Sequence, residues 1–164
     1  MKVLNYRRQL LFSGLLFTLH NIEESVGYAY FSYPSGLKLP FPLPAVVPMV
    51  WAIALITLIA WAVILWANSQ KKENIRRNVL TFFTAIFLLN AFIPHIAGAV
   101  VLQRYVPAVV TSVVLYLPYS FWIIPKLYRS YPAGRLFYVV AFWGVFISIL
   151  LVAVLKVITD AFFR

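Results

Sequence analysis

The sequence predicts an all-α fold, a bundle of about five transmembrane helices that forms a single domain over residues 1–164. Hydrophobic residues make up 63% of the chain and charged residues only 11%, which lies outside the range of soluble globular proteins. Several apolar runs also reach the ~20 residues that a helix needs to cross a hydrocarbon core of about 30 Å. These two observations predict a polytopic integral membrane protein.

The apolar runs define the expected spans in chain order. We place them at about residues 10–30, 46–67, 79–102, 107–124 and 136–158. The first run carries polar residues in its second half, whereas the second has almost none beyond Thr57 and should pack on other helices or face lipid. The third contains Pro94, and the fourth and fifth carry a few hydroxyl groups. The prolines of residues 32–45 predict a stiff, extended loop between the first two spans.

The distribution of basic residues predicts the orientation in the membrane. If the N-terminus is cytoplasmic, the inside carries Lys2, Arg7, Arg8, Lys71, Lys72, Arg76, Arg77, Lys126, Arg129 and Arg135. The outside then carries Lys38, Arg104, Lys156 and Arg164. This bias on short loops favours a protein of the cell (inner) membrane with a cytoplasmic N-terminus and an external C-terminus. The net charge of +10 is explained by these basic residues in short gaps between spans. We therefore expect no nucleic-acid partner.

Two groups of polar residues interrupt the first and third spans. His20 is followed by Glu23 and Glu24, and Asn90 is followed by His95. An ionisable side chain at the bilayer centre costs roughly 2.5–3.5 kcal/mol on insertion scales, so such residues usually serve a function. At a rise of ~1.5 Å per residue, the two groups fall at matching depths in helices that run in the same direction. We therefore expect the two helices to touch through these groups, with the histidine side chains less than about 10 Å apart, roughly two helical turns.

Local geometry refines this expectation at two places. Pro94 cannot donate to the carbonyl of Asn90, so the third helix should kink there and bring Asn90 and His95 onto one side. Glu23 and Glu24 differ by about 100° around the first helix, so only one can point straight at the facing helix. The two carboxylates should therefore not be equivalent.

The ordered set of polar residues resembles the H-x-x-E-E family of small prokaryotic integral membrane proteins, a family of unknown function. The residues that carry the resemblance are His20, Glu23, Glu24, Asn90, His95, Tyr105, Pro107 and Thr111. They cover about residues 15–120, and Ala108 stands where the family usually has glycine after the proline. The resemblance implies a shared site that includes Tyr105 and Thr111, and it implies no particular reaction.

The first functional hypothesis is a membrane-embedded enzyme that acts on a lipid-like or isoprenoid substrate. His20, Glu23, Glu24 and His95 form a nitrogen and oxygen donor set suited to a divalent metal such as Zn²⁺, Fe²⁺ or Mn²⁺. Asn90 would bind the metal or orient a histidine. A spare carboxylate, Glu23 or Glu24, could act as a general base on metal-bound water. Without metal, the same two carboxyls could isomerise or cyclise an apolar substrate by acid and base catalysis.

Two other classes of function use the same residues. Intramembrane Glu and His also build proton relays, so the chain could be a small proton-coupled transporter, which at this length would need to form a homo-oligomer. Alternatively, the polar cluster could only hold helices together in a structural or assembly protein, since such bonds contribute about 0.6 kcal/mol on average. The partners expected in each case are the lipid bilayer and, for the enzyme, an apolar small molecule. Because the chain has no cysteine, disulfides and thiolate metal sites are excluded.

Overall fold

The computed structural model describes residues 4–30 and 46–162, and all regular structure within these ranges is helical. In chain order the elements are α1 (Tyr6–Tyr30), α2 (Val46–Ser69), α3 (Glu73–Asn90), η1 (Ala91–Ile96), α4 (Ala97–Leu102), α5 (Val109–Thr111), η2 (Ser112–Tyr116), α6 (Leu117–Ser130) and α7 (Gly134–Phe162). The π-helical turns η1 and η2 each join two α-helices into one longer segment. The described chain therefore forms five long helical segments, which confirms the predicted all-α class. The loop expected at 32–45 lies outside the described residues.

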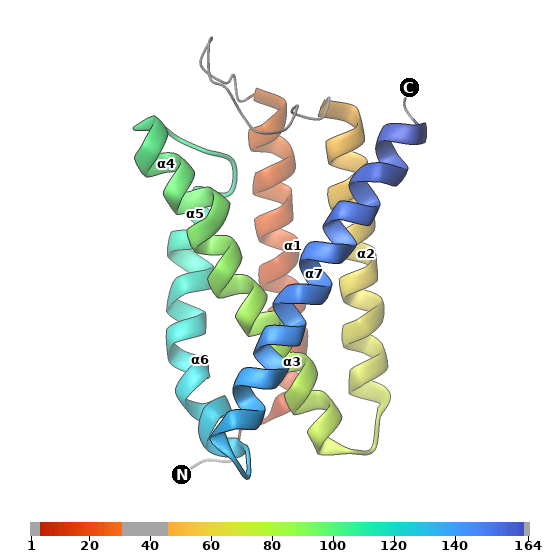
Figure 1. Cartoon of the computed structure of the whole chain (residues 1–164), viewed down its shortest axis with the longest axis vertical. Helices are drawn as coiled ribbons and strands as arrows, with labels where there is room; N and C mark the ends of the chain where they lie inside the picture. The colour runs from red at the N-terminus through yellow and green to blue at the C-terminus, as the bar shows by residue number, and fades with distance from the viewer. Residues whose placement is uncertain (1–3, 31–45, 163–164) are drawn as a thin grey trace.

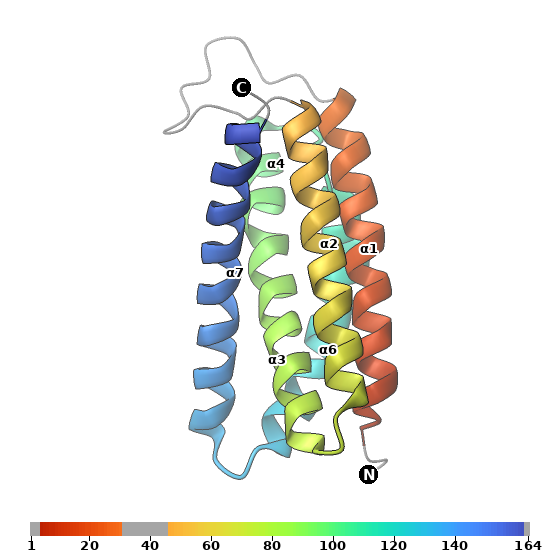
Figure 2. The same ribbon diagram turned by 90° about the vertical axis from the view of Figure 1, so that its right-hand side faces the viewer.

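The five segments lie side by side and alternate in direction (Figures 1 and 2). Helix α3 is central, because it contacts α1, α2, α6 and α7. The α2–α3 and α6–α7 turns lie at the end of the bundle where α1 begins, and α7 ends at the opposite end (Figure 1). We call the first of these the basic end, because most basic residues of the described chain belong to it: Arg7, Arg8, Lys71, Lys72, Arg76, Arg77, Lys126, Arg129 and Arg135.

Four of the segments are long and apolar enough to cross a membrane, namely Val46–Ser69, Glu73–Leu102, Val109–Ser130 and Gly134–Val154. Helix α1 has 25 residues, and at ~1.5 Å per residue it is long enough to cross as well. Its second half is more polar because it carries His20, Asn21, Glu23 and Glu24. It packs along α2 and α3, within the same bundle. The chain is thus a polytopic helical membrane protein.

At the basic end the helices extend beyond the predicted spans. Helix α1 begins at Tyr6 rather than near residue 10, α3 begins at Glu73 rather than near 79, and α6 runs on to Ser130 rather than ending near 124. Hydropathy marks only residues that lie in hydrocarbon, whereas a helix can continue into the headgroup region, where Arg and Lys reach water. The fourth segment begins at Val109 rather than near 107, because a turn precedes it.

The core beside the polar groups is aromatic. Phe17 of α1 lies 6.1 Å from Phe83 and 6.2 Å from Phe87 of α3, measured between ring centroids. Near this contact on α1, the Trp61 indole of α2 packs against Gly14, where an added Cβ would lie 2.9 Å from the ring. The indole N–H also donates to the Thr18 hydroxyl at 2.9 Å. The absence of a side chain at Gly14 therefore lets α2 approach α1 closely.

Candidate functional site

The two polar groups predicted to meet do meet, at the contact between α1 and η1. His20 and Glu24 of α1 and His95 of η1 each offer one ligand atom, and these atoms all lie within 4.8 Å of one another. The ring centroids of the two histidines are 4.9 Å apart, and His20 and His95 are 0% and 2% exposed. The prediction that the histidines lie less than about 10 Å apart is confirmed.

The kink predicted at Pro94 is present. The segment widens into the π-helical turn η1, and Ile93 leaves the helical region at φ −131° and ψ 116°. In an ideal helix, five residues at about 100° each would leave Asn90 and His95 well apart around the axis. In the structure the Asn90 side-chain nitrogen lies 3.3 Å from Nε2 of His95. The kink therefore places both side chains on the side of the helix that faces α1.

The Asn90 amide lies between the two imidazoles. Its Nδ2 is 2.9 Å from Nε2 of His20 and 3.3 Å from Nε2 of His95. An amide NH₂ has two N–H donors and no acceptor at nitrogen, so both imidazole Nε2 atoms accept. Each neutral imidazole then carries its proton on Nδ1. Two Nε2 lone pairs from different helices thus converge on one point.

A hydrogen-bond chain fixes the ring of His20. Its Nδ1 lies 3.0 Å from the Thr111 hydroxyl oxygen, which accepts this N–H. The Thr111 hydroxyl in turn donates to the carbonyl of Ala108 at 3.3 Å. These hydrogen bonds select the His20 tautomer in which Nε2 carries no proton and can accept. In metal sites, groups that hydrogen-bond to the other nitrogen of a histidine ligand fix its tautomer in the same way.

The two carboxylates differ, as predicted. Glu23 accepts from the backbone N–H groups of Val110 at 3.2 Å and Thr111 at 2.7 Å, and from the Tyr105 hydroxyl at 3.1 Å. Glu23 therefore accepts from N–H groups at the start of the fourth segment that have no partner within the helix. Its negative charge there also interacts favourably with the helix dipole. Burial and the Glu23 charge raise the pKa of the Tyr105 phenol, which stays protonated as a donor. Glu24 instead belongs to the histidine group.

Two small residues, Gly27 of α1 and Ala108 of the turn before α5, lie where this turn contacts α1. An added Cβ on Gly27 would lie 2.7 Å from the Tyr105 hydroxyl and 3.1 Å from Cα of Pro107. Ala108 has a left-handed conformation, with φ 62° and ψ 10°. Sequence reasoning missed Gly27, although its place four residues after Glu23, on the same helical face, was a usable signal. The left-handed Ala108 explains why glycine suits this position.

Tyr116 of η2 was also missed as part of the site. Its ring stacks on His20 at 4.2 Å with an interplanar angle of 18°, and on Phe87 at 4.1 Å with an angle of 11°. The hydroxyl groups of Tyr116 and of Ser112 are buried and have no hydrogen-bond partner within the described chain. Buried hydroxyls of this kind are usually satisfied by water or a ligand. No local sequence pattern indicates an aromatic stack between residues so far apart.

The candidate site residues therefore lie close to one another. His20, Glu24, His95 and Asn90 form the inner cluster, and Glu23, Tyr105 and Thr111 connect it to the turn before α5. Fold and site together define a small polytopic helical membrane protein with a buried His/Glu cluster.

Comparison with known proteins agrees with this class. The family model described as "Protein of unknown function with HXXEE motif" matches residues 11–123, and the chain belongs to this family. The chain is also similar to "Uncharacterized protein YrkK" of Bacillus subtilis (strain 168), with 26% identity over 111 residues, 68% of this chain and 69% of that protein. No solved structure matches the chain.

Proposed function

We propose that the chain is a membrane-embedded, metal-dependent enzyme that hydrolyses a lipid-like or isoprenoid substrate. The observation that carries this proposal is the convergence of the His20 and His95 Nε2 atoms on the Asn90 amide, with Glu24 beside them. Two imidazoles and one carboxylate are a donor set that catalytic Zn²⁺ sites use, and they also suit Fe²⁺ and Mn²⁺.

The size of the cluster is compatible with a metal ion after a small contraction. Bonds of about 2.0–2.2 Å in a tetrahedral site place ligand atoms about 3.3–3.5 Å apart. The ligand atoms of His20, Glu24 and His95 lie within 4.8 Å of one another, so contraction by about 1 Å is needed. Rotation of the Asn90 amide would replace its N–H groups by its oxygen at the point where the two Nε2 atoms meet.

Each residue around the cluster has a distinct task in this proposal. A bound divalent ion would lower the pKa of a water molecule and polarise an ester or phosphoester oxygen. Thr111 and Tyr116 hold the His20 ring in place by a hydrogen bond and by stacking. Glu23 holds Thr111 through the backbone N–H, so it positions the site indirectly. The unpartnered hydroxyls of Ser112 and Tyr116 are available to a water molecule or a polar substrate group.

The surroundings favour an apolar substrate. Side chains of α1 and η1 next to the cluster expose large apolar groups on the outside of the bundle, among them Leu19, Ile22, Phe92 and Ile93. In a membrane these side chains contact acyl chains, so a lipid-like molecule can approach the segment that carries the site without leaving the bilayer. The polar reacting group of such a substrate would then lie against the His/Glu cluster.

Metal analysis of the purified protein tests the proposal. Wild-type protein purified without chelators should contain about one divalent ion per chain, and His20→Ala and His95→Ala should contain almost none. Asn21→Ala is the matched control, because Asn21 is buried next to His20 but donates to Thr57 of α2. Equal metal content in all four proteins would refute the site, as would the absence of metal from wild type after loading with Zn²⁺, Fe²⁺ or Mn²⁺.

A further inference from the structure

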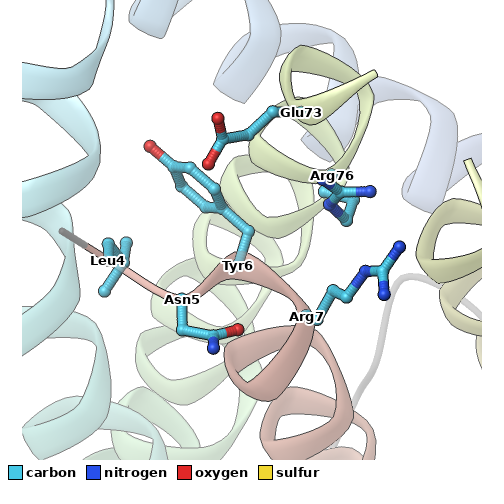
Figure 3. A pocket seen from close by; sticks show the side chains of 6 residues that line it. All are labelled: Leu4, Asn5, Tyr6, Arg7, Glu73 and Arg76. Atoms are coloured by element: carbon cyan, nitrogen blue, oxygen red, sulfur yellow. The ribbon is translucent and has the colours of Figure 1, made fainter. Parts of the chain in front are cut away.

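A pocket of about 340 Å³ lies at the basic end of the bundle, where α1 and α3 begin. Its lining residues are Leu4, Asn5, Tyr6, Arg7, Glu73 and Arg76 (Figure 3). The pocket is separate from the His/Glu cluster, which lies in the second half of α1. It therefore needs an explanation of its own.

The charges of the pocket favour an anion. Figure 3 shows the guanidinium groups of Arg7 and Arg76 on one side of the pocket and the Glu73 carboxylate on the side of the Tyr6 ring. Within the described chain no ion pair joins Glu73 to either arginine. Arg76 donates to the Gln70 carbonyl through one nitrogen, and a guanidinium has five N–H donors in all. Two arginines therefore retain donors that face the pocket.

We propose that this pocket binds the phosphate of an anionic lipid headgroup. Arginine pairs with phosphate through parallel, charge-assisted hydrogen bonds, and basic pockets between transmembrane helices recognise lipid headgroups in this way. The pocket lies where α1 begins and where the candidate span Glu73–Leu102 begins, so its expected depth is that of the headgroups. Leu4 and Tyr6 add apolar contacts that a glycerol backbone or acyl chain can use but that free phosphate cannot.

Lipid titration of the full chain in a neutral detergent tests this proposal. Native mass spectrometry would compare phosphatidylglycerol with phosphatidylcholine, whose choline cation offsets the phosphate charge and is repelled by the two arginines. The anionic lipid should therefore bind about tenfold more tightly. Arg7→Gln and Arg76→Gln should each weaken phosphatidylglycerol binding about tenfold, the loss of one charge-assisted contact. Arg135→Gln is the matched control, because Arg135 is exposed at the same end but does not line the pocket.

Glu73→Gln gives a result that a folding defect cannot imitate. Removing the carboxylate from the pocket removes repulsion of the phosphate, so binding of phosphatidylglycerol should become severalfold tighter. The proposal is overturned if Arg135→Gln weakens binding as much as Arg76→Gln, which would show diffuse attraction only. It is also overturned if Glu73→Gln fails to strengthen binding, or if millimolar inorganic phosphate displaces the lipid completely, which would show a soluble anion site.

Discussion

The carboxylate of Glu23 accepts a 2.7 Å hydrogen bond from the backbone N–H of Thr111, although 88 residues separate the two in the sequence. The side chain of Thr111 in turn holds Nδ1 of His20 at 3.0 Å. Glu23 of the H-x-x-E-E motif thus helps to orient His20 of the same motif, because it holds Thr111 of the fourth helical segment in place. The motif therefore combines a candidate ligand pair, His20 and Glu24, with a residue that orients one of its members.

Thr111→Val should weaken metal binding without unfolding the protein. Valine keeps the shape of threonine but cannot accept the His20 Nδ1 proton, so the ring loses its orientation. Loss of such an outer partner typically costs 10–100-fold in metal affinity. Competition with a chromophoric Zn²⁺ chelator measures this change, and Thr111→Ser should restore most of the affinity. A valine variant with wild-type affinity would show that the hydrogen bond does not position the ring.

The two glutamates should respond differently to the same substitution. Glu24→Gln should abolish metal binding and leave thermal stability nearly unchanged, because it alters a candidate ligand. Glu23→Gln should lower stability by about 1–3 kcal/mol, since the amide cannot accept from all three donors that now satisfy the carboxylate. Melting temperature and metal content, measured on both variants, separate the effects. Identical behaviour of the two would contradict the division of roles.

Ala108→Gly should stabilise the protein. Ala108 has φ 62°, and a left-handed conformation costs a residue with a Cβ roughly 1–2 kcal/mol. Glycine removes most of this cost but makes the unfolded chain more flexible, so we expect a net gain of about 0.5–1 kcal/mol. Ala85→Gly, in the middle of α3, is the control and should destabilise by a similar amount. Chemical denaturation in mixed micelles measures both, and a loss at Ala108 would contradict the proposed strain.

The basic end should lie in the cytoplasm. The loops at this end hold most of the basic residues, which the positive-inside rule assigns to the cytoplasmic side. A cysteine introduced at Ser69 should therefore resist an impermeant thiol reagent in intact cells and react after the membrane is opened. The chain has no native cysteine, so any labelling reports this position alone. Labelling of intact cells would reverse the orientation.

Much of the fold was predictable from the sequence, because the bilayer imposes a length and a composition on each helix. The five segments and the contact between His20 and His95 follow from apolar runs and matched depth. The helix ends at the basic end could not be predicted from hydropathy, because hydropathy does not detect helix that continues into the headgroup region. Glu73 and Ser130 lie in such extensions.

The inner organisation of the site was only partly predictable. The kink at Pro94 follows from the missing N–H, and the inequality of Glu23 and Glu24 follows from helical geometry. Which glutamate faces the histidines depends on how the turn before α5 approaches α1, and that approach depends on the small Gly27. The stacking of Tyr116 on His20 is a tertiary contact that no local pattern encodes.

X-ray absorption spectroscopy of the protein loaded with one equivalent of Zn²⁺ tests the central claim most directly. We expect two imidazole nitrogens and a carboxylate oxygen at about 2.0–2.2 Å from the metal. His95→Ala should retain at most one imidazole in this shell, and Glu24→Gln should lose the carboxylate. A shell without imidazole in wild type, or a shell unchanged by His95→Ala, would contradict the assignment of His20, Glu24 and His95 as a metal site.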